Sequence, residues 1–129
     1  MKKSLAVLVA ALAFTVLSTR SSFADAALDA AALRMVVIVE KVGSIANDQK
    51  TNCDEMATQL SAYADSTATE RAQLNTVLGA ATPADRKALE TKYSARIRAA
   101  QQNIAAGMQA CSSNARVVAA MGKLGNLPK

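Results

Sequence analysis

Apolar residues recur every three or four positions along most of this chain, which is the period of an amphipathic helix. The pattern predicts helices over 26–46, from about Asn52 to just before Gly79, from Thr82-Pro83 to Cys111, and from about Asn114 to Leu124. The β-branched run at 35–39 would also suit a strand, but the alanine-rich residues before it and the helical period favour a helix. The sequence therefore predicts an all-α fold.

The predicted helix ends carry recognisable signals. Thr82 can cap a helix, Pro83 fits its first position, and Asp85 can complete a capping box. Gly79 suits a helix end. Between these ends, the stretch 65–69 has poor helix propensity and few apolar residues, so a kink or frayed turn is expected there.

The two cysteines are equidistant from Thr82, since 53 + 111 = 164 is twice 82. If the second and third helices run antiparallel from this turn, position n faces position 164 − n. The rule pairs Cys53 with Cys111. It also pairs Met56 with Met108 and Leu60 with Ile104, and it places Asp65 near Arg98 and Glu70 near Lys92. The predicted fold is a three-helix bundle built on a long antiparallel helical hairpin, with a short fourth C-terminal helix.

The first predicted helix has an apolar face wider than one neighbour needs, because Val36, Val37 and Val39 extend the main stripe. One interpretation is a helix that packs against two neighbours at once. The other is a binding surface for an unknown protein partner, a second copy of the chain or a membrane. These three valines are the candidate partner-binding residues.

Residues 1–24 have the features of a secretory signal peptide. Lys2 and Lys3 precede an apolar run from Leu5 to Leu17, and Ser22 and Ala24 are small residues suited to a cleavage site. Cleavage near Ala24 is expected, which leaves a single helical domain over 25–129. The expected location is the periplasm or the exterior.

Composition narrows the chemistry. Removing Lys2, Lys3 and Arg20 leaves 12 basic and 10 acidic residues, so the mature net charge is only +2 and nucleic-acid binding is not expected. The chain contains no histidine, which excludes histidine-dependent nucleophilic sites and the usual zinc sites. It also lacks a glycine-rich phosphate loop. We expect no enzyme activity and no cofactor.

Two interpretations of the cysteines remain open. A disulfide between Cys53 and Cys111 would close a long loop and stabilise an alanine-rich bundle by roughly 4 kcal/mol. Alternatively, Cys53 and Met56 could face Met108 and Cys111 and supply four soft sulfur ligands to Cu(I). Methionine three residues from a buried cysteine is also ordinary core filling.

Basic residues gather in the third predicted helix, and the second is acidic. Pairing across the two helices is one explanation. The other is a basic stripe for an anionic lipid or polymer, which would make the protein membrane-associated. The stripe would consist of Arg86, Lys87, Lys92, Arg96 and Arg98.

Several short segments together resemble small exported helical proteins of myxobacteria and related δ-proteobacteria. They are the run from Cys53 to Leu60, Thr82-Pro83, the run from Lys92 to Arg96, the run from Met108 to Cys111, and Val117 to Ala120. The resemblance covers roughly 35–124. It implies a bacterial periplasmic or exterior location, and it implies no activity or site residues.

Together these observations predict an exported, non-enzymatic helical protein of the bacterial envelope that acts as a partner-binding or structural module. The alternatives are a small Cu(I)-binding protein and a protein associated with the membrane surface.

Overall fold

The computed structural model describes residues 21–125, and their side chains from 26 onward. Four α-helices make up this part of the chain: α1 (Ser21–Asp48), α2 (Cys53–Gly79), α3 (Pro83–Ala110) and α4 (Ala115–Lys123). The predicted all-α class is confirmed, and no strand occurs within 21–125. The expected leader lies outside the described residues, except for 21–24 at the start of α1.

Three of the helices begin where the sequence signals place them. The Asn52 side chain accepts a hydrogen bond from the Glu55 backbone N–H at the start of α2. At the start of α3, Thr82 and Asp85 form a capping box in which each side chain accepts from the other's backbone N–H at 3.2 Å. At the start of α4, the Asn114 side chain accepts hydrogen bonds from the backbone N–H groups of Arg116 and Val117. Each cap satisfies backbone donors that have no partner inside the helix.

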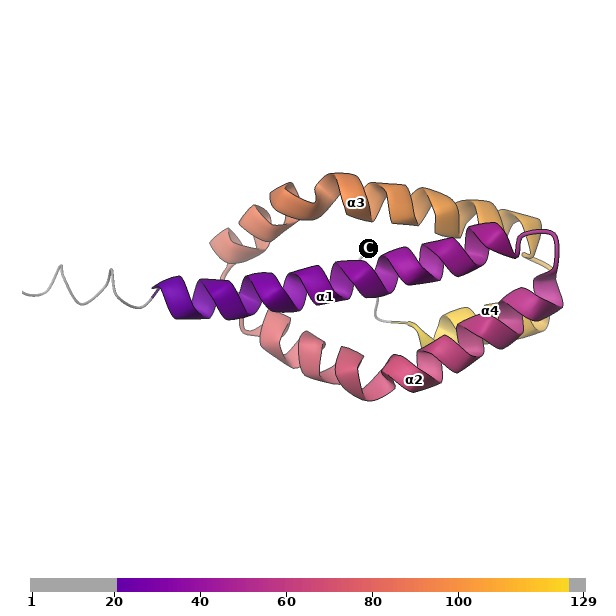
Figure 1. Cartoon of the computed structure of the whole chain (residues 1–129), viewed down its shortest axis with the longest axis horizontal. Coiled ribbons are helices and arrows are strands. Elements are labelled where there is room, and N and C mark those ends of the chain that lie inside the picture. Colours follow the sequence, from indigo (N-terminus) through magenta and orange to yellow (C-terminus); the bar gives the residue numbers. More distant parts are fainter. Residues whose placement is uncertain (1–20, 126–129) are drawn as a thin grey trace, which may run out of the picture.

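The helices form a lens-shaped arrangement (Figure 1). The first helix, α1, runs between α2 and α3, which bow away from each other and meet only at their ends. It packs against both of them, whereas α4 packs against α2. Helices α1 and α3 point in the same direction and α2 points in the opposite one.

This arrangement corrects the predicted hairpin. The ends of α2 and α3 meet as expected, at the turn over 80–82 and at Cys53–Cys111. Along their length, however, α1 lies between the two helices, and each of them packs mainly against α1 or α4, so a directly packed hairpin is not observed. The pattern of apolar positions predicted which face of each helix is buried. The one feature of the sequence that fits a central α1 is the wide apolar face of 26–46.

The core has two parts. The larger part lies toward the disulfide end and contains residues of all four helices, among them Val42, Met56, Leu60, Val117 and Leu124. The smaller part lies toward the α2–α3 turn and is built around Ala32, Val36 and Tyr93, with Leu78, Leu89 and Ile97 packed against it. No residue of α4 belongs to the smaller part.

Helices α1 and α3 approach closely because small residues lie between them. A Cβ atom added to Gly107 would lie 2.5 Å from the carbonyl oxygen of Ala46, and one added to Gly43 would lie 2.9 Å from the carbonyl oxygen of Ala100. Contacts this short leave no space for a side chain. The two glycines therefore set the distance between the helices.

Ion pairs join α1 to both neighbours. Arg96 of α3 makes two parallel hydrogen bonds to Glu40, at 2.7 and 2.8 Å. Lys92 of α3 pairs with Asp29 at 2.7 Å. On the other side of α1, Arg34 pairs with Glu70 of α2.

These pairs correct the charge pairings that the mirror rule predicted. Glu70 contacts Arg34 instead of Lys92. Asp65 contacts Lys123 of α4, at 3.2 Å, instead of Arg98. The acidic partners of α3 therefore come from α1, because α1 occupies the space between α2 and α3.

Helix α2 continues through 65–69, so the stretch is not a frayed turn. The hydroxyls of Ser66 and Thr67 donate to the carbonyl oxygen of Tyr63, at 3.0 and 2.8 Å. Such bonds to the preceding turn often bend a helix, and Figure 1 shows α2 bowed around α1.

Candidate binding cleft

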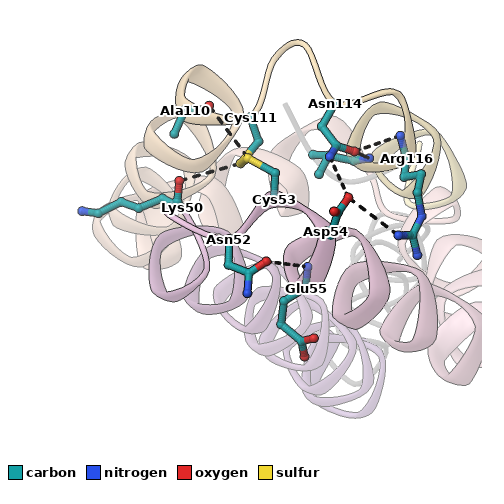
Figure 2. Close-up of a disulfide and its surroundings, with 10 residues drawn as sticks. Lys50, Asn52, Cys53, Asp54, Glu55, Ala110, Cys111, Asn114 and Arg116 are labelled. Atoms are coloured by element: carbon teal, nitrogen blue, oxygen red, sulfur yellow. Dashed lines mark hydrogen bonds and ion pairs between the residues drawn. A yellow bond between two sulfur atoms is a disulfide. The ribbon is translucent and has the colours of Figure 1, made fainter.

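Cys53 and Cys111 are joined in a disulfide, with Cα atoms 5.5 Å apart. The bond links the first residue of α2 to the residue that caps α3. Figure 2 shows it beside the start of α4, where the side chain of Asp54 accepts a hydrogen bond from Asn114, at 3.1 Å, and pairs with Arg116. This end of the molecule is closed by covalent and polar contacts together.

The proposed copper site is not available in this state. Met56 is fully buried, Met108 is partly buried, and both belong to the core cluster that contains the disulfide. The structure thus brings the four sulfur-bearing residues to one end, as predicted. Disulfide formation removes the two thiolates that would have held the metal. Within the described residues, no three His, Cys, Asp or Glu side chains gather closely enough to hold a metal ion.

The valines predicted as a partner-binding face are mostly covered within the chain. Val36 is 4% exposed and Val39 is 1% exposed, and Val37 is partly buried. Val36 and Val39 therefore do not form an exposed apolar patch. The alternative interpretation is confirmed: α1 packs against two neighbours, which is why its apolar face is wide.

Val36 and Val39 nevertheless form the floor of an open cleft of about 390 Å³ at the turn end of the molecule. Helix α1 supplies the floor, the end of α2 one wall and the first half of α3 the other. The main apolar side chains that line it are Val36, Val39, Leu78, Leu89, Tyr93 and Ile97. Its volume falls within the roughly 300–1,000 Å³ that ligand pockets occupy.

The cleft is open because the fourth helix is short. The nine residues of α4 span about 14 Å, whereas α2 spans about 40 Å. Lys123 at the end of α4 lies beside Ser61 and Asp65, in the first half of α2. The second half of α2 and the facing part of α3 therefore lack the cover that α4 gives elsewhere.

Tyr93 is held in place at the cleft by a polar contact outside it. Its hydroxyl donates to the Asp29 carboxylate at 2.9 Å, and Lys92 donates to the same oxygen at 2.7 Å. The Lys92 ammonium and the Tyr93 hydroxyl hold the pKa of Asp29 below its usual 3.8. The ring is thus fixed in the cleft while its hydroxyl is satisfied.

A few polar groups border the cleft: Asn75 from α2, and Arg86 and Glu90 from α3. Arg86 donates from Nη2 to the carbonyl oxygen of Gly79, at 3.2 Å, across the α2–α3 turn. An apolar cleft bordered by a few polar groups is the usual form of a site for a small molecule.

The basic stripe on α3 is partly used inside the molecule. Lys92 and Arg96 pair with acidic residues of α1, and Arg86 donates to Gly79. Only Lys87 and Arg98 of the five make no ion pair or side-chain hydrogen bond to another described residue. Within 21–125, no helix combines the length and the hydropathy that a membrane crossing requires. The stripe therefore offers less charge to a membrane surface than its sequence indicates.

The sequence named Arg86 in the basic stripe, but it did not single out the apolar α3 residues of the cleft, or Leu78 of α2, as a site. These apolar residues lie on the stripes that predicted the core. The available signal was the difference in length between the fourth predicted helix and the two before it, which implies an uncovered stretch of apolar stripe.

No family model, curated protein or solved structure matches this chain.

Proposed function

We propose that this protein is an exported, non-enzymatic binding protein of the bacterial envelope, and that its binding site is the apolar cleft at the turn end. The cleft is the observation that carries the proposal. The leader-like residues 1–24 and the disulfide Cys53–Cys111 support export, because disulfides persist in oxidising compartments.

The architecture suits binding better than reaction. One end of the molecule is closed by α4 and the disulfide, and this end supplies a rigid frame. The other end exposes an apolar cavity whose side chains come from three helices. Burying an apolar guest there removes water from the partly exposed side chains of Leu78, Leu89 and Ile97, at about 25 cal/mol per Å² of apolar surface.

A neutral fluorescent dye tests this function directly. N-phenyl-1-naphthylamine should bind the oxidised, exported protein with one dye per monomer. Leu89→Trp should narrow the cleft and weaken this binding at least about tenfold, which corresponds to 1.4 kcal/mol. The dye is excited at a wavelength that tryptophan does not absorb.

Val118→Trp is the matched control, because Val118 is 51% exposed on α4 and does not line the cleft. It should leave dye binding unchanged. Leu78→Trp, from the opposite wall, provides a second narrowing variant if Leu89→Trp melts at a lower temperature. Absence of dye binding by the folded protein, or binding that neither narrowing variant weakens, would refute the proposed function.

A further inference from the structure

The two ends of the cleft differ in polarity. Along α3 the lining begins with Arg86 beside the turn, continues through Leu89 and Tyr93, and ends at Ile97 near the middle of the molecule. The eleven steps from Arg86 to Ile97 span about 16 Å of helix. The cleft is therefore long, with a cation at its outer end and apolar side chains at its inner end.

Arg86 is a cation without an anionic partner among the described residues. Arg34, Arg96 and Arg116 each pair with a carboxylate, whereas Arg86 has none within 4 Å in the part of the chain the structure describes. Its one hydrogen bond goes to the neutral carbonyl oxygen of Gly79. A guanidinium has five N–H donors, so the bond to Gly79 holds Arg86 at the mouth of the cleft and leaves other donors available.

We propose that the cleft binds a single-chain amphiphile with a carboxylate head group, such as a fatty acid. This inference rests on the proposed function and names its ligand class. The planar guanidinium of Arg86 matches a carboxylate with two parallel hydrogen bonds. The hydrocarbon chain then lies along Leu89, Tyr93 and Ile97, over the floor made by Val36 and Val39.

Glu90 fixes the direction of the ligand. It lies one turn beyond Arg86 on α3 and is the only carboxylate that lines the cleft among the described residues. A carboxylate head placed further in would be repelled by Glu90, so the head group stays at the Arg86 end. Glu90 also provides a test of the charge of the ligand, because replacing its carboxylate by a neutral group should strengthen the binding of an anion.

Calorimetric titration with ligands that share one hydrocarbon chain separates the contribution of the head group to affinity from that of the chain. Dodecanoate, dodecyl phosphate and dodecyltrimethylammonium are added below their micelle concentrations, and dodecanol below its solubility in water, to the oxidised, exported protein. Dodecanoate should bind about tenfold more tightly than dodecanol, as expected for one charge-assisted contact. The ammonium compound should bind more weakly than dodecanol.

Variants assign the effect to Arg86. Arg86→Gln should weaken dodecanoate binding about tenfold and leave dodecanol unchanged, and Arg86→Lys should fall between wild type and Arg86→Gln. Glu90→Gln should strengthen dodecanoate binding. Arg98→Gln, an exposed arginine on the same helix that does not line the cleft, should have no effect.

The outcomes distinguish the two proposals. If the neutral dye fails to bind the folded protein, the proposed function fails. If all four ligands bind equally and Arg86→Gln changes nothing, the cleft remains a binding site but the carboxylate assignment is overturned. Tighter binding of dodecyl phosphate than of dodecanoate would also overturn that assignment.

Discussion

At the scale of single residues, Gly107 is the position where the fold tolerates least change. Its Cα faces the backbone of Ala46 in α1, and an added Cβ would meet the carbonyl oxygen at 2.5 Å. Because the nearest atoms are backbone, no side chain can rotate away. Relief requires α1 and α3 to move apart, and that movement would loosen the contacts of Gly43 with Ala100 as well.

We therefore expect Gly107→Ala to lower the free energy of unfolding by about 1–3 kcal/mol, in the range of other overpacked cores. Gly122→Ala is the matched control, since a Cβ at Gly122 meets nothing within 4 Å. Alanine is the better helix former, so the control should gain up to about 1 kcal/mol. Urea unfolding measures both; equal effects of the two substitutions would contradict the close approach.

The pair of Glu40 and Arg96 makes stability depend on pH in a defined direction. The guanidinium of Arg96 holds the pKa of Glu40 below its usual 4.5. Because the pKa is lower in the folded state, the stabilisation is complete above the unfolded pKa and is lost as the pH falls through the folded one. The urea midpoint of wild type should therefore fall at pH values below about 4.5.

Glu40→Gln should lower the urea midpoint at pH 7, and its difference from wild type should shrink toward zero near pH 2 as the wild-type carboxyl protonates. Glu90→Gln removes a carboxylate that has no partner among the described residues, and it should leave the pH dependence unchanged. A difference between Glu40→Gln and wild type that stays constant from pH 7 to pH 2 would show that the pair does not stabilise the fold through charge.

At the scale of elements, Arg71 of α2 determines how α4 docks. Its guanidinium donates to the carbonyl oxygen of Ala64 at 3.0 Å and to that of Lys123 at 3.2 Å, and to the Thr67 hydroxyl at 3.2 Å. Lys123 is the last residue of α4. A cation at this position satisfies a terminal carbonyl and interacts favourably with the helix dipole.

Arg71→Gln should destabilise the protein by about 1–2 kcal/mol, the range of one or two charged hydrogen bonds. Hydrogen exchange should rise most in α4, because this short helix loses the bond from Arg71 to its last carbonyl oxygen, whereas α2 still packs against α1. Arg98→Gln should change stability by less than about 0.5 kcal/mol. Unchanged protection of α4 amides in Arg71→Gln would contradict a docking role for Arg71.

The sequence predicted the positions of the helices better than it predicted which helices pack against each other. Caps such as Thr82 and Asn114 act locally, so their signals can be recognised from adjacent residues. The position of α1 between α2 and α3 depends on long-range packing, in which Gly43 and Gly107 allow α1 and α3 to approach. Isolated glycines inside a helical pattern do not show which helix they will face, so the mirror rule paired Asp65 and Glu70 with the wrong helix.

At the scale of the whole molecule, α2 and α3 form a closed ring around α1. The turn over 80–82 joins them at one end and Cys53–Cys111 joins them at the other. The apolar stripes do not reveal this closed arrangement, so the sequence indicates the cleft only through the short length of the fourth predicted helix. The same apolar stripes that make the core continue into the part of the ring that α4 is too short to cover.

The disulfide should therefore matter for stability more than for the shape of the cleft. The cysteines are 58 residues apart in sequence, and the chain-entropy model gives about 4 kcal/mol for a loop of this length. Cys53→Ala/Cys111→Ala should lose a large part of that free energy in guanidinium unfolding. Alanine is preferred to serine because Cys111 is 1% exposed and a buried hydroxyl would add its own cost.

Reduction of wild type by dithiothreitol should produce the same loss, and dithiothreitol should have no effect on the double variant. Below the unfolding transition, the double variant should still bind the neutral dye at the turn end, since most apolar cleft residues belong to the smaller part of the core and the turn is intact. Loss of dye binding in a fully folded double variant would show that the disulfide link between α2 and α3, and not local packing, keeps the cleft open.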